Sequence, residues 1–333
     1  MKFGARIPNS GPLASRDNVV RVGDEAQKLG FHSLWVHDHI VWGTEQHRTH
    51  LSAGSAEALN EIQHPNFFES ITTLSYLTGR LKEIKIGIAV IVLPLRNPVV
   101  LAKQLAILDV MSEGKLMIGV APGASNITRP EFEAVGVPYD ERGKITDEYI
   151  RAIRTIWNED LPSFSGKYIN FEKIQIFPKP RQNPLKILIG GSERGISPRA
   201  LRRVVELGDG WIPAYLTADE IAQGMQDITE ASQKQGRVFD GFLVSHELFT
   251  LVNENSLRAH DLAKKSLLTN FATFEEAEKR SLVGTPEEII EKVRRYSKAG
   301  VDITELKFVY SDIPAMLEMM QLYSDKIIPA CKD

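Results

Sequence analysis

The sequence predicts an α/β protein in which 333 residues form a (β/α)8 or TIM barrel. Eight short apolar segments alternate with amphipathic helical segments almost from end to end, which is typical of repeated βα units. A joint in which a helix ends, a glycine follows and a strand begins also recurs, in KLGFHSLWV, ELGDGWIP and KAGVDITELKF. We expect a single domain over 1–333, with insertions near 40–65, 161–183 and 270–284.

The predicted strands are short and rich in β-branched and other apolar residues. Several of them lack alternation of polar and apolar residues, as expected where both faces of a parallel strand are buried. They cover residues 2–7, 32–37, 84–93, 115–120, 185–190, 209–213, 242–251 and 303–309. A doubly wound sheet is the alternative, but the first strand is followed by PNSGPLASRDN and not by the glycine fingerprint usual in that fold.

Two of the predicted helices carry clear signals at their ends. Asn97 is placed to cap the first turn of one helix, and Pro98 suits its first helical position. Thr285 is placed to cap another helix, and Glu288 three residues later completes a capping box. Both helices follow predicted loops, in agreement with the βα pattern. The insertion at 161–183 reads as a β-hairpin.

Composition and charge limit the class of protein. The net charge is −3, so electrostatics give no reason to expect nucleic acid or an anionic membrane as partner. The single cysteine, Cys331, allows no disulfide within the chain and fits a reducing cytoplasm. The most apolar run, residues 86–95, is too short to span a bilayer. We expect a cytoplasmic homodimer that acts on a small-molecule substrate.

Six of the eight histidines fall between residues 32 and 64. Asp38 and His39 directly follow the predicted second strand, and the C-terminal ends of barrel strands are where chemistry takes place. His37 and His39 could together bind zinc, because alternate residues of a strand share a face. The later strand ends supply no further histidine, and His246 lies in the middle of a strand, so we expect no metal site. Asp38 and His39 therefore face a cofactor or move a proton, or they are purely structural.

The rest of the histidine-rich stretch is predicted to be a polar loop. Its histidines are expected at the surface: His47, His50 and His64.

Two turns that contain glycine follow predicted strands. GVAPGASN covers 119–126, and LIGGSERGIS covers 188–197 with adjacent glycines ahead of a helix. Backbone N–H groups of such a loop, together with a helix N-terminus, suit a phosphate, although a tight turn without a ligand fits the pattern equally well. In the strand at 84–93, the small side chain of Ala89 would let a flat ligand approach the backbone.

Taken in order, these pieces resemble the luciferase-like monooxygenase family, and most closely its F420-dependent branch. The matching segments include LGFHSLWVHDHIVW, LPLRNPVVLAKQLAILDVMSEGKLMIGVAPG, FEAVGVPYDERGKITDEYIRAIRTIWNED, FSGKYINFEKIQIFPKPRQ, ILIGGSERGISPRALRRVVELGDGWIP and LVGTPEEIIEKVRRYSKAGV. The resemblance implies a barrel with insertions that binds the deazaflavin F420, or alternatively FMN, in its mouth. The match of 93–123 and 132–160 to the F420 branch implies F420 in preference to FMN.

The resemblance also implies roles for individual residues. His39 resembles the proposed proton donor of F420-dependent dehydrogenases, and Asp38 resembles a residue that hydrogen-bonds the polar edge of the ring. Ala89 and Val90 match the place where the family bulges its third strand behind the ring through a non-prolyl cis peptide. The other implied cofactor-binding residues are Pro122 and Gly123, in a loop that lines the cofactor, and Gly190, Gly191 and Ser192, in the segment that holds its phosphate.

One departure from the family pattern concerns the substrate. Ala124 stands where the F420-dependent sugar-phosphate dehydrogenases carry a catalytic glutamate, so sugar-phosphate oxidation is not implied here. We expect an oxidoreductase that transfers a hydride between the deazaflavin and an unidentified small organic substrate. The alternatives are a monooxygenase that uses reduced FMN and O2, a metal-dependent barrel hydrolase, and a flavoprotein without turnover.

Overall fold

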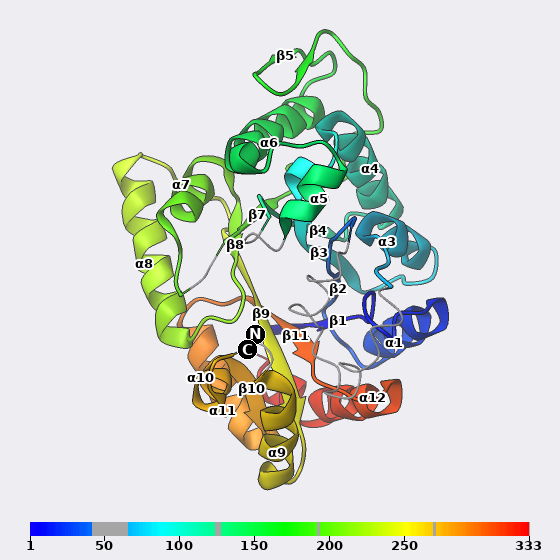
Figure 1. Ribbon diagram of the computed structural model, residues 1–333, viewed down its shortest axis with the longest axis vertical. Helices are drawn as coiled ribbons and strands as arrows, with labels where there is room; N and C mark the ends of the chain where they lie inside the picture. Colours follow the sequence, from blue (N-terminus) through cyan, green and yellow to red (C-terminus); the bar gives the residue numbers. More distant parts are fainter. Residues whose placement is uncertain (42–65, 124–127, 192–193, 269–270, 333) are drawn as a thin grey trace.

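The computed structural model describes residues 1–41, 66–123, 128–191, 194–268 and 271–332. Over these residues eight parallel strands close into a barrel that is surrounded by helices, which confirms the predicted fold (Figure 1). In barrel order the strands are β1 (Lys2–Arg6), β2 (Ser33–Val36), β3 (Lys85–Val92), β4 (Leu116–Ala121), β7 (Ile187–Gly190), β8 (Gly210–Ile212), β9 (Leu243–Val252) and β11 (Ile303–Phe308). Each overlaps its predicted segment. The barrel closes because β11 pairs with both β9 and β1, and β8 pairs with β9.

Two insertions add strands outside the barrel. The stretch 270–284, predicted only as an excursion, contributes helix α10 (Phe274–Lys279) and strand β10 (Ser281–Gly284), which pairs in parallel with the C-terminal part of β9. The predicted hairpin within 161–183 is formed by β5 (Phe164–Ser165) and β6 (Asn170–Phe171), and it projects beyond α6 (Figure 1). The predicted insertion at 40–65 lies outside the described residues from 42 onward.

The helices pack around the outside of the barrel. The longer ones are α1 (Arg16–Lys28), α3 (Ser70–Thr78), α4 (Pro98–Met111), α6 (Arg142–Asn158), α7 (Pro198–Leu207), α8 (Ala218–Lys234), α9 (Ser256–Leu267), α11 (Pro286–Lys298) and α12 (Ile313–Leu322). Shorter ones are α5 (Arg129–Ala134), α13 (Ile328–Ala330), the 3-10 turns η2 (Leu93–Leu95) and η4 (Tyr139–Glu141), and the π-helical turn η5 (Tyr323–Ile327). None of the helices in the described part of the chain combines the length and the apolar character needed to cross a membrane.

The predicted helix ends are confirmed. The Asn97 side chain accepts hydrogen bonds from the backbone N–H groups of Val99 and Val100 at the start of α4. Thr285 and Glu288 form the predicted reciprocal capping box at the start of α11. These side chains satisfy N–H groups that a helix cannot pair internally, which fixes where each helix begins.

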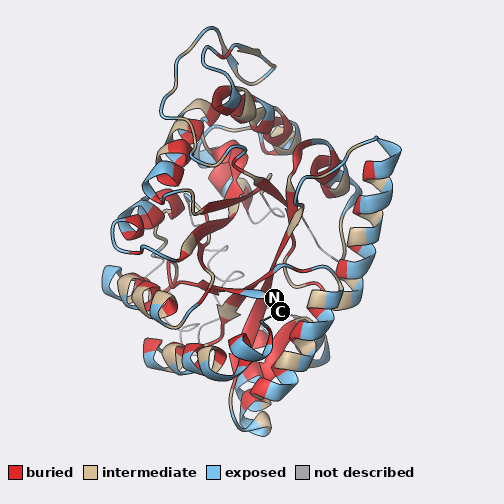
Figure 2. Cartoon of the chain, turned by 180° about the vertical axis from the view of Figure 1, so that it is seen from behind, coloured by how far each residue is buried: buried red, intermediate tan, exposed pale blue. Residues whose placement is uncertain are grey.

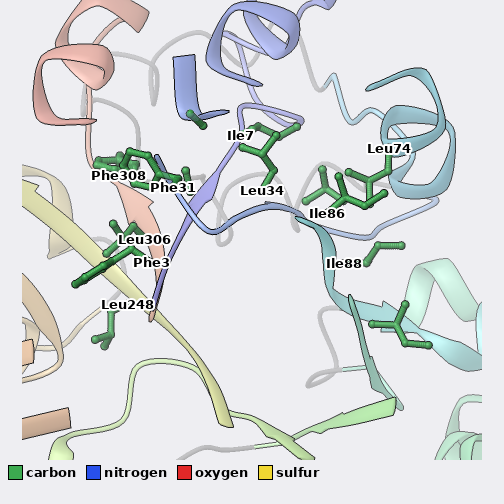
Figure 3. Packing of buried hydrophobic residues seen from close by; sticks show 14 of the residues in the cluster. Phe3, Ile7, Phe31, Leu34, Leu74, Ile86, Ile88, Leu248, Leu306 and Phe308 are labelled. Carbon is green, nitrogen blue, oxygen red and sulfur yellow. The ribbon is translucent and has the colours of Figure 1, made fainter. Parts of the chain in front are cut away.

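Buried apolar side chains form two main groups, besides a smaller one made by Val92, Leu95, Phe132 and Tyr139. One lies between the barrel and the helices, where side chains such as Phe3, Leu34 and Phe308 pack together (Figure 3). Accordingly, the strands are buried while the outer faces of the helices are exposed (Figure 2). The other is the barrel interior, to which six different strands contribute one residue each: Trp35, Ala89, Met117, Leu188, Ile212 and Ile303.

Trp35 shows how tightly this interior is packed. A Cβ atom added at Gly4 or at Gly87, on the strands to either side of Trp35, would lie 2.3 Å from the nearest indole atom. Glycine is therefore required at both positions for the indole to fit. The barrel interior is a packed core, and the polar side chains described next lie among these residues or at the C-terminal ends of the strands.

Candidate active site

The chain that leaves β2 is held in place by a buried asparagine. Asn9 donates a hydrogen bond from Nδ2 to the carbonyl oxygen of His37 (3.0 Å), and the His37 N–H donates to Asn9 Oδ1 (3.2 Å). This double contact joins the segment after β1 to the segment after β2. It fixes the backbone from which Asp38 and His39 project, at the C-terminal end of the barrel.

Asp38 is buried, and its carboxylate is occupied by protein donors. Arg96 binds it through two hydrogen bonds of 2.6 Å, one to each carboxylate oxygen, and also contacts Glu69 at 2.8 Å. The Ser70 hydroxyl donates at 2.7 Å, and the Val92 N–H donates at 3.0 Å. The side chain has an exposed fraction of 0%. Asp38 therefore anchors β3 and the start of α3, and its direct contact with a cofactor stays a prediction.

The third strand is bulged where the resemblance implies. The peptide bond between Ala89 and Val90 is cis, and the pairing of β3 with β4 shifts register between Ile88 and Ile91. Arg6, on β1, donates from Nη2 to the carbonyl oxygen of Ala89 (2.8 Å), while Asp38 accepts from the Val92 N–H. Charged side chains from two other parts of the barrel thus hold the bulge from both of its ends.

His39 forms a pair with a glutamate that sequence reasoning did not single out. Its Nδ1 lies 2.6 Å from Oε1 of Glu131, a fully buried residue of α5. The other carboxylate oxygen of Glu131 accepts from the backbone N–H of Ile40 (3.1 Å), so the same side chain holds the backbone next to His39. Phe67 packs its edge against the imidazole at a centroid distance of 5.2 Å. A carboxylate on Nδ1 orients the ring and favours proton exchange at Nε2.

A second charged group lies inside the barrel. Arg6 forms an ion pair with Glu247 on β9 and lies 3.8 Å from Oε2 of Glu305 on β11. The Ser245 hydroxyl donates to Oε1 of Glu305 at 2.7 Å, and the Tyr215 hydroxyl donates to Glu247. All three charged residues are buried, so their charges interact in a poorly solvated space.

Burial raises the pKa of the Glu305 carboxyl to about 7, and Arg6 only partly opposes this. The unfolded chain then gives up the proton near pH 4.5 while the folded chain still holds it. Raising the pH from about 5 to about 7.5 should therefore lower the free energy of unfolding of the native protein relative to Glu305→Gln. The difference should be on the order of 3 kcal/mol and level off at higher pH. Urea unfolding of both proteins across this pH range is the measurement, and parallel pH profiles would contradict the assignment.

The loops after β4 and β7 place the other predicted cofactor residues at the same end of the barrel. Pro122 and Gly123 directly follow β4, and Gly190 ends β7. Gly191 has a φ of +137°, and a Cβ there would lie 2.8 Å from Ala200 in the first turn of α7, so glycine is required. Helix α7 begins at Pro198, directly after the turn at 188–197, as the sequence suggested. Ser192 lies outside the described residues.

The histidine predicted in the middle of a strand, His246, does not join the site. His246 is buried on β9, accepts a hydrogen bond from the Leu216 N–H at 3.1 Å, and packs on Tyr296. Burial lowers its pKa to about 3, so it stays neutral and serves the structure. In the described part of the chain no three histidine, cysteine or acidic side chains are grouped as a metal site would need. Three loop histidines lie outside the described residues: His47, His50 and His64.

A family model described as luciferase-like monooxygenase matches residues 1–303 of the chain. The chain therefore belongs to the luciferase-like monooxygenase family, as its sequence suggested, and this supports the prediction of an oxidoreductase. Among curated proteins it is 24% identical over 306 residues to an FMNH(2)-dependent dimethylsulfone monooxygenase of Pseudomonas fluorescens, covering 82% of this chain and 79% of that one. It is 26% identical over 215 residues to an uncharacterized protein of Mycobacterium tuberculosis, covering 63% of this chain and 73% of that one.

Solved structures share the fold over the whole chain. An F420-dependent secondary alcohol dehydrogenase in complex with an F420-acetone adduct has a TM-score of 0.80 at 18% identity and covers 100% of this chain and 99% of its own. The FMN complex of the oxygenating constituent of 3,6-diketocamphane monooxygenase from Pseudomonas putida has a TM-score of 0.75 at 16% identity. The match covers 99% of this chain and 98% of that one. These neighbours use different cofactors, so the fold alone does not choose between them.

Proposed function

We propose that this protein is an F420-dependent oxidoreductase that transfers a hydride between the deazaflavin and a small organic substrate. The observation that carries the proposal is the pairing of two features at one end of the barrel. One is the bulge at Ala89–Val90, held by Arg6 and Asp38. The other is His39, whose imidazole is oriented by Glu131 and which directly follows Asp38 in the chain.

The residues of the barrel mouth fit a flat heterocycle with one polar edge. Val90 is half-buried and apolar, and it lies against the glycines of neighbouring strands, since a Cβ at Gly119 would be 2.9 Å from its side chain. Among the described residues, the buried Nε and Nη1 atoms of Arg6 have no hydrogen-bond partner. An apolar surface beside spare donors suits a deazaflavin or flavin ring, whose phosphate-bearing tail we assign to Gly190, Gly191 and Ser192.

The cofactor, when bound, supplies the hydride chemistry. The protein supplies the group that moves the proton and the side chains that hold the site in place. His39 exchanges a proton at Nε2 while Glu131 holds Nδ1 and keeps the ring oriented. Asp38 and Arg6 keep the backbone of β3 rigid, so that its bulge presents a fixed surface. Pro122 and Gly123 border this region from β4.

An FMN-dependent monooxygenase is the second candidate, because the similarity to the dimethylsulfone monooxygenase extends over 82% of the chain. Titration of the full-length protein with each cofactor, followed by fluorescence quenching, separates the two. We expect saturable binding of F420 with a lower dissociation constant than that of FMN. Micromolar binding of FMN without binding of F420 would favour the monooxygenase, and oxygen uptake with reduced FMN would then establish it.

A further inference from the structure

A second group of side chains lies at the same end of the barrel, on strands β9 and β11 and in the segments that follow β8 and α9. Lys307, near the end of β11, donates from Nζ to the Tyr215 hydroxyl at 3.1 Å. Its ammonium also lies 4.7 Å from the ring centroid of Phe249 on β9. Tyr215 stacks on Phe249 with centroids 4.7 Å apart, and Phe271 contacts both rings edge-on. A cation thus sits beside a surface of three aromatic rings.

The backbone that carries Tyr215 is held in an unusual conformation. Its φ is +56°, which is rare for a residue other than glycine, asparagine or aspartate. The Tyr215 N–H donates to the carbonyl oxygen of Glu247 (2.9 Å), and Arg280 donates to the carbonyl oxygen of Tyr215 (3.0 Å). These bonds keep the hydroxyl directed at Lys307 and Glu247. Such conformations persist where the surroundings fix them, often at functional sites.

The charge of Lys307 is not neutralised by its neighbours. Across the described residues, no carboxylate comes within ion-pair distance of its ammonium. Glu247 is engaged by Arg6 and by the Tyr215 hydroxyl, and the buried Glu305, whose pKa burial raises to about 7, is partly protonated at neutral pH. A half-buried ammonium without a counter-ion attracts an anionic group more strongly than an exposed one does.

We propose that Lys307 binds the carboxylate of a small substrate whose apolar part rests on the half-buried rings of Tyr215 and Phe271. The ammonium, which the Tyr215 hydroxyl holds in place, matches a single carboxylate, and the aromatic rings favour an apolar body over a sugar or a cation. This inference rests on the proposed function, because it takes the ligand to be the substrate of the oxidoreductase. It adds the chemical class of that substrate, an organic carboxylate, and the residues that select it.

Calorimetric titration with benzoate and with benzyl alcohol tests the proposal. We expect the native protein to bind benzoate saturably and Lys307→Met to bind it about 10 to 100 times more weakly, as for loss of a hydrogen bond to a charged group. Lys307→Arg should restore much of the affinity because it keeps the charge. Benzyl alcohol should bind the native protein and Lys307→Met alike. The matched control is Lys326→Met, which changes an exposed lysine paired with Glu254 and should leave benzoate binding unchanged.

Two results would overturn the assignment. In one, the native protein does not bind benzoate at millimolar concentration. In the other, the native protein and Lys307→Met bind benzoate with equal affinity. If Lys307→Met does not fold, as judged by its melting curve, Lys307→Gln replaces it under the same criteria. Titration of the same variant with F420 keeps the two proposals apart. If Lys307→Met binds both benzoate and F420 as the native protein does, the carboxylate site is wrong and the cofactor assignment stands. If the native protein does not bind F420, the cofactor assignment is wrong, and the benzoate titrations still test the carboxylate site.

Discussion

Replacement of His39 by asparagine is expected to lower kcat by about 10²–10⁴-fold, the usual contribution of general acid–base catalysis, with little change in cofactor affinity. The imidazole is 16% exposed and is oriented by a buried carboxylate, which is the arrangement expected of a group that exchanges a proton with a ligand. Asparagine preserves a polar side chain near Glu131 but cannot carry a proton. Steady-state kinetics with a cofactor titration on the same preparation are the measurement.

Glu131→Gln is the companion variant. It keeps the size of the side chain and its contact with the Ile40 N–H, while an amide replaces the carboxylate that orients the imidazole. We expect kcat to fall, by less than in His39→Asn. If His39 is structural, its replacement should lower the melting temperature and cofactor affinity together. Near-native kcat in His39→Asn between about pH 6 and 8 would exclude the proton-donor role.

Replacement of Arg6 by methionine is expected to lower the free energy of unfolding by about 3–5 kcal/mol, because removing one partner of a buried ion pair leaves the other charge uncompensated. Here Glu247 would lose its cationic partner, and Ala89 would lose a hydrogen bond to its carbonyl oxygen. Methionine fills most of the space, so a cavity contributes little. Denaturant unfolding at neutral pH measures the effect.

Two comparisons make this result specific. Arg16→Met changes an arginine whose side chain is 74% exposed and should alter stability by less than about 0.5 kcal/mol. Adding Glu305→Gln to Arg6→Met should recover part of the lost stability, because it removes a second carboxyl from the same buried group. If Arg6→Met unfolds in two states and loses less than about 1 kcal/mol of unfolding free energy, the buried carboxylates do not depend on Arg6 for their stability.

The fold could be predicted because both barrel faces leave a local pattern in the sequence. Buried strands appear as apolar runs, and glycine marks the joints between helices and strands. Asp38 and His39 could be placed because they directly follow a strand. Strand β10 was missed because it lies in an insertion and, among the described residues, pairs with the extended end of β9 alone.

Partners distant in the sequence could not be predicted in the same way. Glu131 lies 92 residues from His39, and Arg96 lies 58 residues from Asp38, so only the folded barrel brings them together. The sequence does contain a signal for the charged residues inside the barrel. Arg6 and Glu305 are charged residues inside apolar strands, and a buried charge requires a partner.

Asp38 shows how tertiary structure changes a residue's interpretation. Its position suggested a contact with the ring of a cofactor, yet its side chain is fully buried and bound by Arg96, Ser70 and the Val92 N–H. The structure therefore adds a positioning role at β3. The effect of Asp38→Ala on cofactor affinity should come at least partly through this strand.

The measurement that tests the central claim most directly is a crystal structure of the protein with F420. Our account predicts that the ring system lies against Ala89–Val90, with His39 beside it at the C-terminal end of the barrel and the phosphate near Gly190 and Gly191. F420 bound elsewhere on the protein, or a ring held away from β3 and out of reach of His39, would contradict the account.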